Sequence, residues 1–396
     1  MSPDPVTCAA LGVPDDLVAA LSARQISAPF PIQAATIPDA LAGRDICGRA
    51  PTGSGKTLAF AIALIARTGR AAPHRPSTLV LVPTRELAVQ VTAAIVPLAK
   101  ARRHYVVAVY GGASQRPQVQ SLRRGAAIVV ATPGRLADLH QQGLVDLSGV
   151  QFVVVDEADR MADMGFLPQV RRLLDEVSPT RQTLLWSATF DHGVDALVRR
   201  YQRDPVCHDV LPDSAQLNAM AHTFLPVEAA TKLDTAATVL RSHGRGIVFC
   251  RTRRIADRVA HQLSRTGLET TVIHGSRSQP QRQRAIDSFG RGDVQVLVAT
   301  DVAARGIHID DVGVVVHWNP VDDPKDYVHR SGRTARAGAS GTVVSLVEPG
   351  DAAKIRALRI ALDLPGHCPG EELTTVTAKR QRSTPPSRRG RRRPTR

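Results

Sequence analysis

At 396 residues the chain exceeds the length at which a single hydrophobic core usually stays undivided, so two domains of ordinary size are expected. A hydrophobic fraction of 43% and a charged fraction of 22% indicate a soluble globular protein. The formal net charge of +15 favours a polyanionic partner.

No apolar run approaches the roughly 18 residues of a membrane span, and the N-terminus lacks the layout of a signal peptide. We therefore expect a cytoplasmic protein without membrane association. The five cysteines are odd in number, scattered and without a C-x-x-C pair. This distribution indicates neither a disulfide framework nor a zinc cluster.

The first informative segment is the glycine-rich stretch 50–57, which lies between an expected short strand ending at Arg49 and an expected helix at 58–67. Such a loop turns backbone N–H groups toward a polyphosphate at a helix N-terminus, while a lysine reaches the β- and γ-phosphates and a hydroxyl holds Mg²⁺. Ala50 breaks the strict pattern at its first glycine, so a simple glycine turn is the alternative. The predicted phosphate-binding residues are Thr52, Gly53, Ser54, Gly55, Lys56 and Thr57.

From residue 45 onward, short Val/Ile/Leu runs alternate with helical stretches. Near-continuous apolar strands separated by helices are typical of a parallel sheet that is covered on both faces. In the first half, strands are expected at 78–82, 105–109, 127–130, 152–155 and 183–186.

Two carboxylates, Asp156 and Glu157, follow directly after the expected strand 152–155. They should lie at the carboxyl edge of the sheet, where open α/β folds bind ligands. Asp156 can hold Mg²⁺ together with Thr57, and Glu157 can polarise the water that attacks a γ-phosphate. Acidic tetrapeptides at helix starts are common, so the motif alone is weak evidence. The predicted magnesium site rests on its position directly after a buried strand.

The alternation weakens between Asp204 and Asn218 and then restarts, which predicts a second α/β domain without a phosphate loop. Two such domains enclose a cleft whose closure can depend on ligand. We assign 1–205 to the first domain, 206–218 to a linker, 219–365 to the second domain and 366–396 to a tail. Strands of the second domain are expected at 247–249, 271–273, 296–298, 314–316 and 342–344.

The tail 366–396 holds nine Lys and Arg against two Glu, and therefore seven of the fifteen net positive charges. Its Pro/Ser/Arg composition predicts disorder, and its charge predicts nucleic-acid binding through phosphate contacts. A solubilising tail is the alternative.

The segment 329–338 offers basic groups from the second domain to a bound nucleotide. Arg333 and Arg336 lie three residues apart, so a helix would project both in one direction. Guanidinium groups that arrive when a cleft closes act as arginine fingers on a transferring phosphoryl group. An ordinary basic surface helix is the alternative.

In this order the motifs resemble those of DEAD-box ATP-dependent RNA helicases of superfamily 2, over residues 8–365. The short tail and the run 159–166 are similar to bacterial members. The resemblance implies two tandem RecA-like α/β domains, ATP and Mg²⁺ as cofactors, and an RNA-dependent ATPase that locally unwinds short RNA duplexes. It also implies RNA as partner, with ribosomal or RNA-decay proteins as candidate protein partners. The alanine at position 50 is the residue that this family has at the first position of the loop.

For the nucleotide site, the segment 29–33 resembles the adenine motif, in which Gln33 reads the adenine edge beside Ile26. Asp301 would contact the ribose from the second domain, and Arg305 would help to hold the closed cleft. The implied catalytic residues are Lys56, Asp156, Glu157, Arg333 and Arg336, and the implied coupling residues are Ser187, Thr189 and His329.

The RNA-facing positions implied by the resemblance are rich in arginine, hydroxyl and glycine residues, which suit a sugar-phosphate backbone. No aromatic stacking platform is evident, so little sequence preference is expected. These positions are Pro83, Thr84, Arg85, Gly111, Gly112, Thr132, Pro133, Gly134, Arg135, Thr252, Gly275, Gln279, Arg282 and Thr300, with His274 beside Gly275.

Three positions depart from the family pattern. Cys8 stands where an upstream aromatic is expected, Gln25 where a glycine usually precedes Ile26, and Ser331 where isoleucine is common. The alternatives in function are a superfamily 2 DNA helicase, and an RNA clamp or annealing chaperone.

Overall fold

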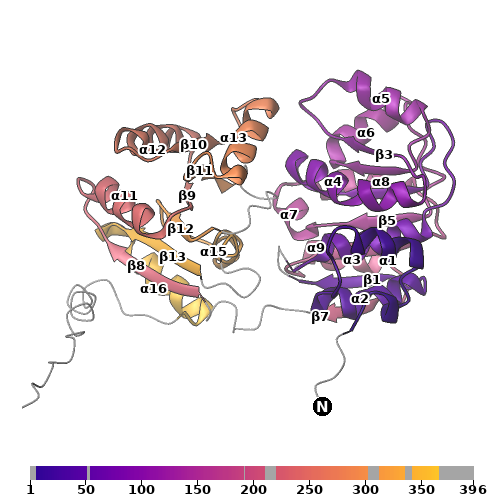
Figure 1. Ribbon diagram of the computed structural model, residues 1–396, viewed down its shortest axis with the longest axis horizontal. Coiled ribbons are helices and arrows are strands. Elements are labelled where there is room, and N and C mark those ends of the chain that lie inside the picture. The colour runs from indigo at the N-terminus through magenta and orange to yellow at the C-terminus, as the bar shows by residue number, and fades with distance from the viewer. Residues whose placement is uncertain are drawn as a thin grey trace, which may run out of the picture.

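The computed structural model describes residues 6–50, 54–190, 192–209, 220–301, 312–334 and 341–364. They form two α/β units that lie side by side, each built on one sheet (Figure 1). None of the described helices has the length and apolar character that crossing a membrane requires.

The first sheet is wholly parallel, with strand order β3-β4-β2-β5-β6-β1-β7. The strands expected from the sequence are present in it, and each observed end lies within one residue of the expected end. Their bounds are β1 Ile46–Arg49, β2 Thr78–Leu81, β3 Val106–Val109, β4 Ile128–Ala131, β5 Phe152–Val155, β6 Gln182–Ser187 and β7 Val206–Asp209.

Helices cover both faces of this sheet because its central strands are apolar on both sides. Val80 and Val154 belong to one buried cluster, while their chain neighbours Leu79 and Val153 belong to the other. The first face is covered by η1 Ala9–Leu11, α1 Asp15–Ser22, α2 Pro31–Leu41, α3 Lys56–Arg67 and α4 Arg85–Ala101. The second is covered by α5 Gln115–Arg123, α6 Pro133–Gln141, α7 Ala158–Asp163, α8 Leu167–Asp175 and α9 His192–Tyr201.

The second sheet is also parallel, with strand order β10-β11-β9-β12-β13-β8. Its strands are β8 Met220–Pro226, β9 Gly246–Cys250, β10 Thr270–Ile273, β11 Val296–Thr300, β12 Val314–His317 and β13 Gly341–Val347. Helices α11 Lys232–His243 and α12 Arg253–Arg265 cover one face. The other face carries α13 Gln279–Arg291, α15 Pro324–Ser331 and α16 Ala352–Leu362, with η2 Pro349–Asp351 before α16.

Two edge strands were not predicted. Strand β7 pairs with β1 from Val206 to Asp209, so the first unit extends into the segment that we assigned to the linker, and the assignment of 206–209 was wrong. Its residues alternate between half-buried and exposed. Because three of the four are Cys, His and Asp, the segment lacks the apolar run that usually predicts a strand. Strand β8 was missed because it mixes polar and apolar residues.

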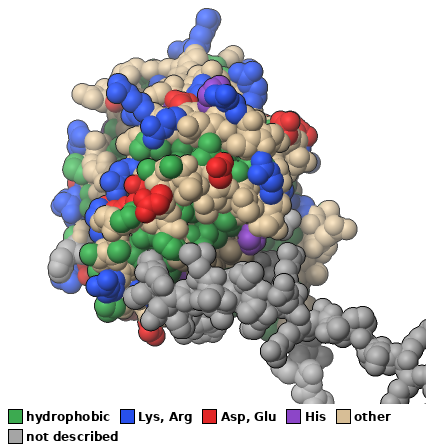
Figure 2. Space-filling model, turned by 90° about the vertical axis from the view of Figure 1, so that its left-hand side faces the viewer, with side chains coloured by type: hydrophobic (Ala, Val, Ile, Leu, Met, Phe, Trp, Pro, Cys, Tyr) green, Lys and Arg blue, Asp and Glu red, His purple; other side chains and the backbone are tan. Residues whose placement is uncertain are grey.

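The outer face of the second unit is mixed in character (Figure 2). Lys and Arg side chains gather over its upper part, while hydrophobic side chains are exposed in its middle and lower part. Ile360 on α16 is 78% exposed and is the most exposed large hydrophobic residue among the described residues. The basic tail 366–396 lies outside the described residues.

We predict that Gly48→Ala destabilises the first unit, because a Cβ at this position would overlap the ring of Trp186 on the neighbouring strand. Trp186 is fully buried and cannot move aside, so overpacking should cost about 1–3 kcal/mol. The measurement is urea unfolding. Gly69→Ala is the control, since its Cβ would meet nothing within 4 Å, and an equal loss in both variants would contradict the prediction.

Candidate nucleotide and RNA site

The phosphate loop ends in a glycine that no other residue could replace without strain. Gly55 has φ 92° and precedes α3, and a Cβ on it would lie 2.6 Å from Gln33 Nε2 and 2.9 Å from Phe30 Cδ2. Lys56 is buried, and its Nζ donates to the Ala50 carbonyl at 2.6 Å. The lysine is thus held inside the loop by a carbonyl that a phosphate oxygen can replace. Thr52 and Gly53 lie outside the described residues.

Gln33 sits against this loop with both ends of its amide engaged. Its Oε1 accepts from the Phe30 N–H at 2.9 Å, and its Nε2 donates to the Gly55 carbonyl at 3.0 Å. One lone pair of the amide oxygen and one N–H of the amide nitrogen remain, which fits the expected contact with an adenine edge. Of the departures nearby, Cys8 is buried and Gln25 has φ 60°, which is the left-handed region that favours glycine.

The two carboxylates after β5 are both buried at the sheet edge. Burial raises the pKa of Asp156 to about 7, although Lys56 opposes the shift. Among the described residues no cluster of three His, Cys, Asp or Glu could hold a metal. Asp156 and Thr57 would therefore supply only part of the ligands that Mg²⁺ requires.

Glu157 behaves differently from its neighbour. Burial by itself raises the pKa of Glu157, but Arg160, Lys56 and Arg333 lower it to about 2. Arg160 Nη1 donates to Glu157 Oε2 at 2.8 Å, and both side chains are buried. Glu157 is therefore ionised at neutral pH and suited to orienting a water molecule through hydrogen bonds.

The end of β6 is tied to α7 through Asp159. Its Oδ2 accepts from the backbone N–H groups of Ala188 and Thr189, each at 3.2 Å, and its own N–H donates to Ser187 Oγ at 3.2 Å. The structure thus brings the predicted coupling residues Ser187 and Thr189 onto the Asp-Glu-Ala-Asp turn. Asp159 and Arg160 were not among our predicted site residues. The only sequence feature that could have indicated a role for them is their position in, or directly after, that tetrapeptide.

The two units meet around Glu157. A cavity of about 10 Å³, which is room for one water molecule, is lined from both units. Arg333 is buried there and lowers the pKa of Glu157 across the gap. Arg305 and Arg336 lie outside the described residues. The lining residues are Lys56, Glu157, Asp159, Arg160, Ala188, His329 and Arg333.

Asp301 was expected to face the ribose, but its carboxylate is bound by an arginine of its own unit. Arg330 Nε lies 2.5 Å from Asp301 Oδ1, and Arg330 Nη2 donates to Oδ2 at 2.5 Å. This fork fixes the end of β11 against α15. Thr300, the last residue of β11, is buried beside it. Ile26 is half-buried and packs against the first hydrophobic cluster.

In the first unit, the predicted RNA-facing residues gather at the carboxyl ends of β2, β3 and β4. Thr84 caps α4 by accepting from the Leu87 N–H at 3.3 Å. The Arg85 guanidinium lies against Gly112, where any Cβ would overlap it. Arg135 donates from both Nη atoms to the Ala113 carbonyl at 3.3 Å. The same edge carries Pro83, Gly111, Thr132, Pro133 and Gly134.

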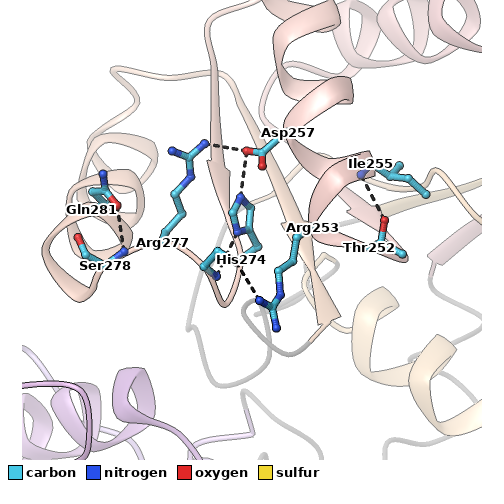
Figure 3. Close-up of polar contacts among 9 residues, drawn as sticks. Thr252, Arg253, Ile255, Asp257, His274, Arg277, Ser278 and Gln281 are labelled. Carbon is cyan, nitrogen blue, oxygen red and sulfur yellow. Dashed lines mark hydrogen bonds and ion pairs between the residues drawn. The ribbon is translucent and has the colours of Figure 1, made fainter.

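In the second unit, a polar network shapes the loop that carries Gly275 (Figure 3). The Ser276 N–H donates to His274 Nδ1 at 3.3 Å, and His274 Nε2 forms a hydrogen bond with Asp257 Oδ1 at 3.0 Å. Arg277 also donates to Asp257, at 2.7 Å. Although burial opposes the shift, these two partners lower the pKa of Asp257.

Nearby, Thr252 caps α12 and Gln279 begins α13. The Gln279 amide nitrogen and oxygen are buried, and neither has a partner among the described residues. Arg282, expected to contact RNA, lies instead 3.0 Å from Glu86 Oε1 of the first unit. Both side chains are buried, so this ion pair joins α13 to α4 across the cleft.

Comparisons with known proteins give two family matches along the chain. A family model described as DEAD/DEAH box helicase matches residues 30–197, and one described as Helicase conserved C-terminal domain matches 231–338. The chain is 40% identical over 354 residues to the ATP-dependent RNA helicase DBP2 of Candida albicans, covering 86% of this chain and 62% of that protein. It therefore spans less than two thirds of that relative.

Two solved structures are similar over nearly the whole chain. A DEAD box protein from the hyperthermophile Methanococcus jannaschii is 32% identical, with 91% of this chain and 98% of that chain covered and a TM-score of 0.54. Dbp5 of S. cerevisiae, bound to RNA and ADP BeF3, is 27% identical, with 91% and 94% covered and a TM-score of 0.80. The expected pair of RecA-like domains is confirmed. The curated relatives compared are from yeast and plants, which does not support a bacterial subgroup.

We predict that Arg160→Met lowers the free energy of unfolding at pH 7 by about 3 kcal/mol, because it leaves the Glu157 carboxylate buried without its closest cation. The folded pKa of Glu157 lies below its unfolded value, so its contribution is present above about pH 4.5 and is lost as the pH falls toward 2. Urea unfolding from pH 7 to pH 3 should show the deficit shrinking. Arg172→Met, at an exposed position, is the control, and a deficit independent of pH would contradict this account.

Proposed function

Because the chain belongs to the DEAD/DEAH box helicase family, we propose that it is an ATP-dependent RNA helicase. It binds single-stranded RNA, hydrolyses ATP to ADP and phosphate when its cleft closes, and locally separates short RNA duplexes. The observation that carries the proposal is the shared cavity in which Lys56 and Glu157 of the first unit meet His329 and Arg333 of the second.

In the proposed reaction, Lys56 exchanges the Ala50 carbonyl for a phosphate oxygen of ATP. Thr57 and Asp156 would hold Mg²⁺, which would neutralise charge on the phosphate oxygens. Glu157, kept ionised by Arg160, orients the attacking water. Arg333, together with Arg336, stabilises the charge that develops on the γ-phosphate.

Coupling to RNA is proposed to run through the hydrogen bonds between Asp159 on α7 and the end of β6. Asp159 holds Ser187 and Thr189 beside the water-orienting Glu157. A shift of α7 would therefore displace the end of β6, and the reverse. RNA lies on the arginines, hydroxyls and glycine N–H groups at the carboxyl edges of both sheets. Contact with its backbone gives little sequence preference.

Several finer assignments belong to the same proposal. Asp301 and Arg305 contact the ribose and hold the cleft after the Arg330 pair rearranges. The first domain reaches Asp209, the remaining boundaries stand as assigned, and the protein acts in the cytoplasm, with ribosomal or RNA-decay proteins as partners. A bacterial subgroup rests only on the run 159–166.

Steady-state phosphate release tests the proposal, measured without nucleic acid, with single-stranded RNA and with single-stranded DNA of equal length. We expect stimulation by RNA alone. Glu157→Gln should lower the stimulated rate by about 100-fold or more, because the neutral amide cannot orient the attacking water as the carboxylate does. RNA and ATP binding should persist in this variant.

The matched control is Glu269→Gln, which removes one exposed carboxylate far from the cavity and should behave as wild type. Equal stimulation by DNA would replace the proposal with a DNA helicase. RNA binding without turnover in the wild type would replace it with an RNA clamp or annealing chaperone.

Deleting residues 371–396 should weaken RNA binding and flatten its dependence on salt, because the tail's arginines release counterions from the RNA. Fluorescence anisotropy with one RNA at several salt concentrations measures both quantities. The control carries the tail at full length with its arginines replaced by glutamine. Unchanged affinity in both variants would make the tail a solubiliser.

A further inference from the structure

Two cysteines face each other at one edge of the first sheet. Strands β1 and β7 are parallel neighbours, and Cys47 and Cys207 are register partners. Neighbouring strands lie about 4.7–4.9 Å apart, and register partners project toward the same face. This spacing falls within the Cα separation of about 4.4–6.8 Å that a disulfide spans.

The surroundings of the two thiols differ in a way that suits stepwise oxidation. Cys207 is exposed on the edge strand, where a small oxidant can reach it, whereas Cys47 is buried behind it. Burial, followed by the charge and hydrogen bonding of Cys207, raises the pKa of Cys47 to about 12, so the two sulfurs interact. The other described cysteines, Cys8 and Cys250, are buried in separate hydrophobic clusters.

We propose that Cys47 and Cys207 are a modification site at which a peroxide forms a reversible disulfide. The Cys207 thiolate attacks hydrogen peroxide, which gives Cys207 sulfenic acid and hydroxide. The Cys47 sulfur then attacks the sulfenic sulfur, the S–S bond forms, and the oxygen leaves as water after taking up the thiol proton. In total, two thiols and one peroxide become one disulfide and two water molecules.

The bond would join two strands with different continuations. Strand β1 leads into the phosphate loop through Ala50, which accepts from Lys56. Strand β7 is the last described element before the second unit. Bridging close neighbours across a parallel sheet requires local distortion, and strained or exposed disulfides are readily reduced. The inference does not depend on the proposed function.

Peptide mass spectrometry on the full chain tests it. The folded protein is treated with hydrogen peroxide, alkylated under denaturing conditions and digested with trypsin. The expected product is peptide 45–49 joined to peptide 204–232, lighter than their sum by two hydrogen atoms and separated again by dithiothreitol. Alkylated Cys47 in the oxidised protein, or Cys207 joined to Cys368 or to a second copy of the chain, would overturn the proposal.

Two variants complete the test. In Cys207→Ser, Cys47 should stay a thiol after peroxide treatment, because burial alone keeps the oxidant away from it. Cys250→Ser removes another buried cysteine, one in a separate hydrophobic cluster, and should form the cross-linked peptide pair as the wild type does. Oxidation of Cys47 in Cys207→Ser would show that Cys207 is not the site of attack.

Discussion

The charge balance around Glu157 is the constraint on which the rest of this structure depends. A buried carboxylate needs compensating cations, and here they come from three separate places in the chain. Arg160 is supplied by the same turn, Lys56 by the phosphate loop, and Arg333 by the other unit. Because the third cation belongs to the second unit, the placement of that unit and the ionisation of Glu157 are linked.

A second buried charge pair at the cleft also depends on residues from both units. Arg282 and Glu86 are both buried and compensate each other only while the units are together, since each comes from a different sheet system. Arg330 and Asp301, by contrast, satisfy each other within one unit. The Arg282–Glu86 pair therefore depends on contact between the units. The Arg330–Asp301 pair fixes the local surface that the second unit presents.

Local patterns in the sequence predicted much of this. The apolar runs gave the central strands, because residues buried on both faces leave a continuous signal, and the glycine-rich loop marked the start of α3. The edge strands β7 and β8 were not predicted, because half-exposed strands carry polar residues that interrupt the apolar run. The partners of Arg282 and Asp301 were not predictable, because Glu86 and Arg330 lie far away in sequence and only the packed fold brings them near.

Gln33 shows how a fold can fix the orientation of a side-chain amide. An amide can usually rotate by half a turn and exchange its donor with its acceptor. Here the Phe30 N–H demands an oxygen and the Gly55 carbonyl demands an N–H, so only one orientation is compatible. The positions of the remaining amide N–H and lone pair are therefore set by the backbone at the start of α2 and in the phosphate loop. A glutamine in the same place without these neighbours could present donor and acceptor in either order.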